Sequence, residues 1–503
     1  MSLVRFLALS ALFFPSVAEA SAGNDREHRE AVRSWVAEHR SNILDELTRF
    51  VALPNVSKDH DDLEVNAEHL LRMLERRGLE TKRLETETAP YLFARLAPEA
   101  PSAGSRPPVV LFYAHYDGQP VDPDRWTVGK PFVPTLRGNP SDPEARLYAR
   151  SASDDKAPIV GLLTAIDALR ELGFPPNIEA KFLFDPEEEI GSPQLPAVVE
   201  RHAELLQADL MIFVDGPVHQ SLRPTVVFGT RGIVTVTLTV YGPARPLHSG
   251  HYGNWAPNPA EKLARLLASM KDADGRVTIE GFYDDVVPLS ERGKAALAAI
   301  PAIDDELGGE LLLPRRYGAG KSLQELINLP SLNVRGMASA WVGDRVRTII
   351  PDTATAEIDL RLVKGVEPDA QVRRLVEHVR KQGFHVVDNP PDAEVRGRFP
   401  DVAQITRRDA GRPAIRTPMD TPWSRSVITA VRRAVEVEPV LMPTLGGTLP
   451  IYPLQEKLGL PIYGVPVVNP DNNQHAPDEN LRLGNLWDAI AIYASLLRLP
   501  PVR

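Results

Sequence analysis

Short apolar segments alternate with a helix-like pattern in the first half of this chain. Val109–Tyr113 and Leu210–Val214 are continuously apolar, which is typical of central strands covered on both faces. Ile178–Phe184 is similar, although charged residues interrupt it. Before it, apolar residues recur at helical spacing over Lys156–Leu172. This β-α-β order predicts an α/β fold with a mostly parallel sheet flanked by helices.

The pattern changes near residue 231. Ile233–Val240 and Ala354–Leu362 alternate between apolar and polar residues, which is typical of an antiparallel sheet with helices on one side. Helical periodicity is also present over residues 25–52, 62–78, 259–270 and 369–382. The β-α order then resumes over Ser424–Val435, Ile462–Val468 and Glu479–Leu497. We therefore predict that residues 21–230 and 412–503 form one domain, into which a second α+β domain is inserted over residues 231–411.

The first 20 residues are expected to be a signal peptide. Met1–Arg5 carries a positive charge, Phe6–Val17 is apolar, and Ala18-Glu19-Ala20 has small residues at the positions that an export peptidase reads. The apolar stretch is shorter than the about 20 residues that span a bilayer. We expect cleavage after Ala20 and a soluble periplasmic or secreted protein that is not held in a membrane afterwards.

Composition limits the chemistry. The chain of 503 residues contains no cysteine, so a metal site must use His, Asp and Glu. The net charge of −10 gives no reason to expect nucleic acid or an anionic membrane as a partner.

Reactive side chains follow each predicted strand. They are His115 and Asp117, the run Glu187–Glu189, Asp215 and His475, together with Asp154 just before the predicted helix. In an open parallel sheet, the carboxyl ends of the strands lie at one edge, where ligands bind. We therefore expect these side chains to converge.

Taken singly, each has a structural explanation. His115 could be a hydrogen-bonded core histidine, and Asp154, with Ser153, could cap the helix. Asp215 precedes a glycine and could form a turn, and His475 could be an exposed loop histidine. Their coincidence points instead to metal, because clustered carboxylates need cations and this donor set suits a hydrolytic zinc site. Two metal ions sharing one carboxylate would neutralise the cluster, and a carboxylate that binds no metal would serve as the base.

A series of motifs then makes the family recognisable. They are His115–Pro120, Leu147–Lys156, Glu187–Ser192, Leu247–Gly250, Arg347–Pro351, Gly446–Thr448 and His475–Glu479. With them the chain resembles the dinuclear zinc metallopeptidase family, which includes carnosinase-type dipeptidases, glutamate carboxypeptidase, aminoacylase and acetylornithine deacetylase.

The resemblance implies two zinc ions per subunit, although cobalt or manganese could occupy such sites. His115 and Asp215 would bind one ion. Glu189 and His475 would bind the other, and Asp154 would bridge the two.

The resemblance also assigns roles beside the metals. Glu188 would be the general base that activates the shared water and later protonates the leaving amine. Asp117 would orient the imidazole of His115. Glu187 would have no catalytic role.

Other matched positions concern the substrate. His248 matches a histidine that helps to polarise the scissile carbonyl, often across a dimer interface, which implies a homodimer formed through the inserted domain. Thr348 and Arg361 match positions that hold the substrate carboxylate, although without the family match a surface ion pair would explain Arg361 equally well. Gly447 and Thr448 match a loop that contacts the substrate.

Some positions depart from the family pattern. They are Ala149, Ser151, Ala157, Asp185-Pro186 and Asp478. None of them removes a metal ligand, so we expect them to affect loop shape and substrate choice.

We expect the protein to be an exported dizinc peptidase that hydrolyses the amide bond next to a free carboxylate in dipeptides or short peptides. An N-acyl-amino-acid deacylase with the same site is the nearest alternative. A non-catalytic zinc-binding protein is an alternative of another class, but it would have no use for Glu188. A serine hydrolase is disfavoured because the chain has no nucleophile-elbow motif.

Overall fold

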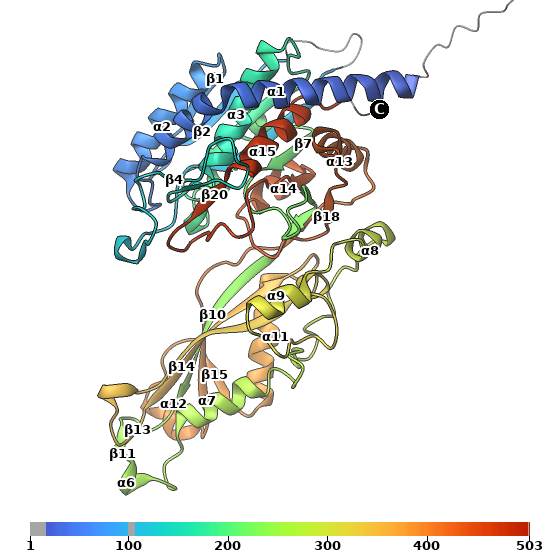
Figure 1. Cartoon of the computed structure of the whole chain (residues 1–503). Coiled ribbons are helices and arrows are strands. Elements are labelled where there is room, and N and C mark those ends of the chain that lie inside the picture. The colour runs from blue at the N-terminus through green and yellow to red at the C-terminus, as the bar shows by residue number, and fades with distance from the viewer. Residues whose placement is uncertain (1–16, 99–105, 501, 503) are drawn as a thin grey trace, which may run out of the picture.

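The computed structural model describes residues 17–98, 106–500 and 502. Two units are visible in Figure 1. The large unit is an eight-stranded sheet with the helices that cover it, and the small unit is a five-stranded sheet with its own helices. Residues 1–16 of the expected signal peptide lie outside the described part of the chain, and helix α1 (Val17–Val51) begins at its end.

The large sheet has the strand order β1-β2-β6-β3-β7-β19-β8-β18. Its strands are β1 (Glu80–Leu84), β2 (Tyr91–Leu96), β3 (Val109–His115), β6 (Glu179–Asp185), β7 (Leu210–Phe213), β8 (Thr225–Val227), β18 (Val440–Met442) and β19 (Ile462–Gly464). The pairs β6–β3, β3–β7 and β7–β19 are parallel, whereas β1 and β2 add an antiparallel edge. This confirms the predicted mostly parallel sheet.

Both faces of the large sheet are covered. Phe112 on β3 faces the cluster formed with α1, α2 (His60–Glu75), α3 (Lys156–Glu171), α13 (Pro422–Val435) and α15 (Leu483–Leu496). Its neighbour Tyr113 faces the other cluster, to which α4 (Leu195–Arg201) and α14 (Tyr452–Leu458) contribute. Burial on both faces explains why the strand is continuously apolar.

The structure corrects the predicted starts of two helices. The residue that caps α3 is Asp155, and it makes no side-chain capping bond, so the candidate caps Ser153 and Asp154 do not cap this helix. The final helix begins at Leu483, because Asn480–Arg482 forms strand β20 instead. Strand β20 pairs with β5 (Arg146–Tyr148), which also pairs with β4 (Thr135–Arg137).

The small sheet has the order β12-β14-β10-β16-β15. Its strands are β10 (Gly232–Tyr241), β12 (Ser331–Ala338), β14 (Thr353–Leu362), β15 (His385–Val387) and β16 (Val402–Arg407), and only the β15–β16 pair is parallel. One face packs on α7 (Pro259–Ala268) and α11 (Pro368–Lys381). On the other face Thr237 donates a hydrogen bond to Glu357 at 3.0 Å. The alternating strands are therefore confirmed, while the residue boundaries of the inserted domain stay a prediction.

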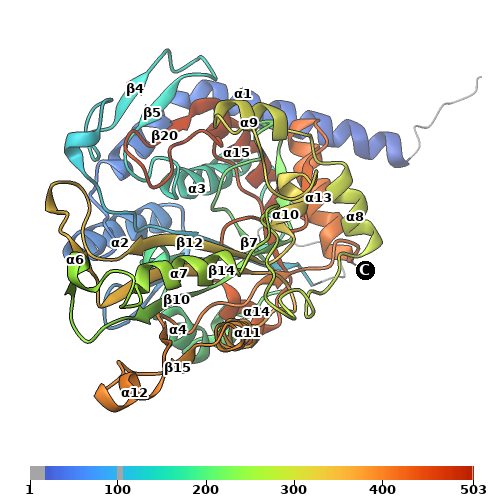
Figure 2. The same cartoon turned by 90° about the horizontal axis from the view of Figure 1, so that it is seen from below.

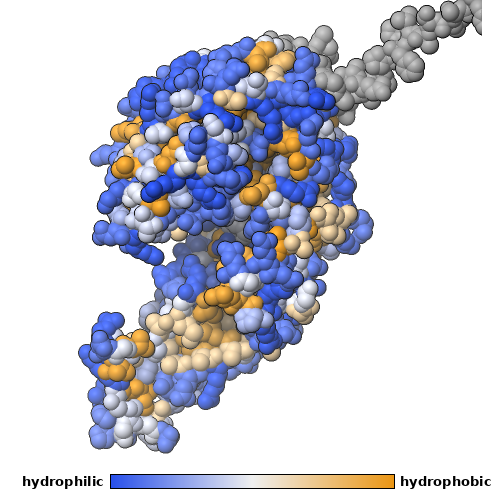
Figure 3. Space-filling view, viewed as in Figure 1, coloured by the Kyte–Doolittle hydropathy of each residue, from blue (hydrophilic) through white to orange (hydrophobic). Residues whose placement is uncertain are grey.

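The chain passes between the units where β10 leaves the large unit in Figure 1, and in Figure 2, seen from below, the small unit lies in front of the large one. Short helices lie between β10 and β12 in sequence: α8 (Glu291–Ala298), α9 (Asp304–Glu310) and α10 (Leu323–Ile327). In the space-filling view of Figure 3 the surface is hollowed between the two units. No helix in the described ranges has both the length and the apolar character needed to cross a membrane.

Candidate metal centre

The strand ends of the large sheet bring the predicted residues together. Strand β3 ends at His115, and β6 leads into a one-turn helix over Glu188–Ile190. Asp215 follows β7, and Asp154 lies just before α3. Because β6, β3 and β7 are neighbours and run parallel, their carboxyl ends meet at one edge.

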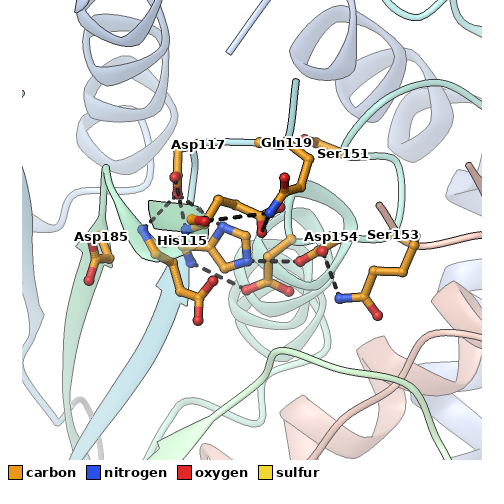
Figure 4. A network of polar contacts seen from close by, with 12 residues as sticks. His115, Asp117, Gln119, Ser151, Ser153, Asp154 and Asp185 are labelled. Carbon is orange, nitrogen blue, oxygen red and sulfur yellow. Dashed lines mark hydrogen bonds and ion pairs between the residues drawn. The ribbon is translucent and has the colours of Figure 1, made fainter. Parts of the chain in front are cut away.

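His115 lies at the centre of this cluster (Figure 4). Its ring is fully buried, with Nδ1 3.2 Å from Asp117 Oδ1 and Nε2 2.8 Å from Asp154 Oδ1. One nitrogen therefore faces the carboxylate of Asp117 and the other faces that of Asp154. Asp117 lies where the sequence predicted.

The side chains that could hold metal form two groups. One group is His115, Asp154 and Asp215, the other is Asp154, Glu189 and His475, and in each group the donor atoms lie within 4.8 Å of one another. Asp154 belongs to both. His475 Nε2 is 3.1 Å from Asp154 Oδ2 and 3.2 Å from Glu189 Oε2.

Without cations, burial and mutual repulsion disfavour the ionised form of several carboxyl groups in this cluster. Burial, reinforced by the charge of Asp154, raises the pKa of Asp215 to about 7. Burial and the charges of neighbouring acids also raise the pKa of Glu188 and of Glu189. Divalent cations would remove this cost, because they favour the ionised carboxylates.

The acidic neighbours favour the protonated form of the two histidines. Burial opposes the charged form of His115, but hydrogen bonds to Asp117 and Asp154 outweigh it and hold the pKa well above 6.5. Hydrogen bonds to Asp154 and Glu189 raise the pKa of His475 to about 10. Positions that attract a proton this strongly also suit a metal ion. The nitrogen and oxygen donors of the two groups therefore fit a pair of divalent cations.

Asp117 has a second task that the sequence did not reveal. Its Oδ1 accepts the backbone N–H of Glu188 at 3.1 Å, and its Oδ2 accepts that of Glu189 at 3.1 Å. One carboxylate thus orients both the histidine and the glutamate turn.

Three supporting residues were missed from the sequence. Gln474 Nε2 donates to Asp154 Oδ2 at 2.6 Å, and Gln119 Nε2 donates to Glu189 Oε2 at 2.8 Å. Glu479 is fully buried and accepts the backbone N–H of Asp154 at 3.1 Å. Glu479 and Gln119 lie inside recognised motifs, which was the available signal, but their partners depend on loop geometry.

Of the three glutamates, Glu187 lies outside both metal-binding groups. Its carboxylate accepts a hydrogen bond from Thr88. At another departure from the family pattern, Asp478 accepts the backbone N–H of Thr127 at 2.8 Å and of Val128 at 2.9 Å. It therefore fixes a loop.

A cavity of about 540 Å³ opens beside the cluster. Asp154, Glu188, Asp215 and His475 contribute to its lining, and so do three of the predicted substrate residues: Arg361, Gly447 and Thr448. Arg361 Nη1 donates to Thr448 Oγ1 at 3.0 Å. Since Arg361 comes from β14 of the small unit, both units build this cavity.

The structure does not bring His248 and Thr348 to the cluster. Both side chains are exposed at the far tip of the small unit, where β11 (Leu247–His248) pairs with β13 (Ile349–Ile350) next to α6 (Ser249–Tyr252) (Figure 1). His248 Nδ1 accepts the backbone N–H of Gly250 at 3.1 Å. Within one chain, these two residues are therefore apart from the metal centre.

Comparisons with known proteins identify the family. Residues 111–499 match the model of Peptidase family M20/M25/M40. The chain belongs to this family. The resemblance seen in the sequence is thereby confirmed, and so are the fold and the assignment as a metallopeptidase-type hydrolase. M20 peptidases are metal-dependent enzymes, in agreement with the two groups of donors.

Relatives extend the similarity over most of the chain. The Cys-Gly metallodipeptidase dug1 of Schizosaccharomyces pombe is 26% identical, covering 77% of this chain and 78% of its own. The human Beta-Ala-His dipeptidase is 26% identical, covering 81% and 76%. The solved structure of an M20 family metallo-carboxypeptidase, Sso-CP2 from Sulfolobus solfataricus, superposes with a TM-score of 0.76 at 28% identity, covering 91% of this chain and 98% of that one.

Proposed function

We propose that this M20 peptidase is an exported dipeptidase that uses two zinc ions to hydrolyse the amide bond next to a free carboxylate. The observation that carries the proposal is that both metal-binding groups share Asp154 and open, with Glu188, onto the same cavity as Arg361. The dipeptidase names of two relatives agree with it.

In this proposal, five side chains hold the metal ions: His115, Asp154, Glu189, Asp215 and His475. When bound, such ions lower the pKa of a water molecule and polarise the scissile carbonyl. The remaining chemistry belongs to Glu188. Its carboxylate takes a proton from the attacking water and returns it to the nitrogen of the leaving amine. Asp117 keeps this carboxylate in place through the backbone of its turn.

Arg361 gives the cavity its specificity for a free carboxylate. Its guanidinium offers paired N–H donors, and the hydrogen bond to Thr448 holds it in place. The substrate would therefore lie with its terminal carboxylate at Arg361 and Thr448, beside the loop of Gly447, and with its scissile bond at Glu188.

The chain is proposed to act as a homodimer. His248 and Thr348 lie near each other at the tip of the small unit, where the backbone N–H of Ser249 donates to the carbonyl of Thr348 at 3.2 Å. In a dimer formed through the small unit, His248 of the partner subunit would reach the scissile carbonyl. The edge strand β12, with exposed Val334 and Met337, offers a surface for such an interface.

We further propose that residues 1–20 direct export and are removed after Ala20. The catalytic domain would then comprise residues 21–230 and 412–503, and the inserted domain residues 231–411. Sequencing the N-terminus of the exported protein tests this directly, and a start at Ser21 is the expected result.

N-acyl-amino-acid deacylation is the second candidate, and one observation favours it. The acidic residues that line the cavity are Asp154, Glu188 and Asp215, which the mechanism already uses. Among the described residues that line the cavity, no further carboxylate is present to pair with the ammonium group of a dipeptide. Apolar residues such as Leu323 and Leu445 line the same cavity and could pack against an acyl chain.

The deciding experiment compares a panel of dipeptides with N-acetyl amino acids on one preparation of known metal content. Faster turnover of dipeptides supports the proposal. If N-acetyl amino acids are hydrolysed and dipeptides are not, the chain is a deacylase.

A further inference from the structure

An arginine from the junction between the units contacts the turn that carries Glu188 and Glu189. Arg412 Nη2 donates to the carbonyl of Gly191 at 2.9 Å. Gly191 ends this turn with φ at +88°, and its N–H donates to the carbonyl of Glu188 at 2.7 Å. A Cβ atom at position 191 would overlap the guanidinium of Arg412. The motif glycine therefore serves two needs: a left-handed backbone and room for this arginine.

Arg412 lies on the segment that returns the chain from the small unit to the large unit, and it forms an antiparallel bridge with Ile233 on the outgoing strand β10. Its N–H donates to the carbonyl of Ile233 at 2.7 Å, and its carbonyl accepts the N–H of Ile233 at 2.9 Å. At Gly232, a Cβ atom would lie 2.7 Å from the backbone nitrogen of Ala414. The outgoing and returning segments are thus packed backbone against backbone, so they would move as a pair.

Several side chains of the large unit also hold the turn. Asp117 accepts the N–H groups of Glu188 and Glu189 at 3.1 Å each. Asp185 accepts the N–H of Glu187 at 2.8 Å and the hydroxyl of Ser192 at 2.6 Å. Arg412 thus adds a contact that links this turn to the junction between the units.

We propose that Arg412 is a positioning residue that couples the orientation of the small unit to the general base. The inference rests on the proposed role of Glu188. A shift of the outgoing and returning segments moves the guanidinium of Arg412. The hydrogen bond to the Gly191 carbonyl then moves the end of the turn. The small unit also supplies Arg361, so the substrate carboxylate and the base would be brought into register by one movement.

Arg412→Ala, Arg412→Lys and Arg416→Ala test this inference on the full-length, metal-loaded protein. Arg416 is the matched control, because it lies on the same returning segment and donates to the carbonyls of Val287 at 2.7 Å and Pro288 at 3.0 Å, away from the turn. We expect Arg412→Ala to lower kcat about tenfold to a hundredfold with KM changed less than about threefold. Arg412→Lys should recover most of the loss, because an ammonium group can also donate to a carbonyl.

A double-mutant cycle provides the second measurement. Gly191→Ala should reduce kcat more in the wild-type background than in Arg412→Ala, where space for the methyl group has been made. Equal losses of kcat in Arg412→Ala and Arg416→Ala would overturn the inference, as would additive effects in the cycle or an Arg412→Lys variant no better than Arg412→Ala. Failure of the proposed base is recognised separately, because Glu188→Gln would then retain activity while these variants lose it.

Discussion

Glu479 Oε1 accepts the backbone N–H of Asp154 at 3.1 Å, so a buried carboxylate supports the residue that the two candidate metal-binding groups share. The same oxygen accepts the N–H and the hydroxyl of Ser153 at 3.1 and 2.9 Å. The other oxygen accepts Arg150 Nη1 at 2.6 Å and the N–H of Ser151 at 3.1 Å. The loop before α3 is thus organised around one acidic side chain.

Glu479→Gln should weaken metal binding although it changes no metal ligand. Whichever way the amide turns, its NH₂ group meets N–H donors, and Arg150 loses its buried counter-charge. We expect a loss of about tenfold to a hundredfold in metal affinity and of about 3 kcal/mol or more in the free energy of unfolding. Metal titration and thermal unfolding measure the two effects.

The neighbouring Asp478 provides the control for this change. The hydrogen bonds that its carboxylate accepts in the described part of the chain come from the loop at Thr127 and Val128. Asp478→Ala should therefore leave metal affinity within about threefold of the wild type. Comparable losses of metal affinity in both variants would show that Glu479 has no special role.

The sequence was sufficient to predict the sheet and the cluster at its edge, because burial on both faces leaves a continuous apolar run that ends at the site. His115 and Asp215 were found in this way. The partners of Glu479 were not, because they come from a loop more than 300 residues away along the chain.

Helix and strand starts were harder to predict for a related reason. Asp154 is of a residue type that often caps helices, but its carboxylate lies between His115 and His475 instead. Asn480–Arg482 continues a helical pattern, yet it forms β20 because an edge of β5 is available to pair with it. In both cases a tertiary contact outweighs a local preference. His248 and Thr348 are exposed at the tip of the small unit, so a role in the site would require a second subunit, and no local pattern in the sequence encodes such a contact.

Replacing the proposed base separates catalysis from metal binding. Glu188→Gln keeps the size of the side chain but removes the group that accepts the proton. We expect kcat to fall about a hundredfold to ten-thousandfold while the metal content stays unchanged. Glu187→Gln is the matched control, because Glu187 lies on the same turn but outside both metal-binding groups, and it should retain most of the activity. Undiminished hydrolysis by a metal-loaded Glu188→Gln variant would contradict the mechanism.

The stability of the metal-free protein should depend on pH, because burial and the charge of Asp154 raise the pKa of Asp215 to about 7. In the unfolded chain an aspartate has a pKa of about 3.9. A carboxyl group with a raised pKa in the folded state contributes stability that is complete below about pH 4 and is lost as the pH rises through about 7. We therefore expect Tm of the chelator-treated protein to fall between about pH 5 and about pH 8.

Bound cations should remove this dependence, because they favour the ionised carboxylates. Tm of the metal-loaded protein should change little over the same range, so the gap between the two forms widens as the pH rises. Thermal unfolding of both forms at several pH values provides the measurement. A metal-free protein that is more stable at about pH 8 than at about pH 5 would contradict this account of the cluster.

Arg361 should determine how strongly the enzyme prefers a free terminal carboxylate. Loss of a charge-assisted hydrogen bond typically weakens binding about tenfold to a hundredfold, so Arg361→Ala should raise KM for free dipeptides by this factor. Dipeptide amides lack the carboxylate, and their kcat/KM should be almost unaffected. The ratio of kcat/KM between each dipeptide and its amide, compared for wild type and variant, is therefore the measurement to make. If the ratio is unchanged, Arg361 acts only in holding Thr448, and the carboxylate must be recognised elsewhere.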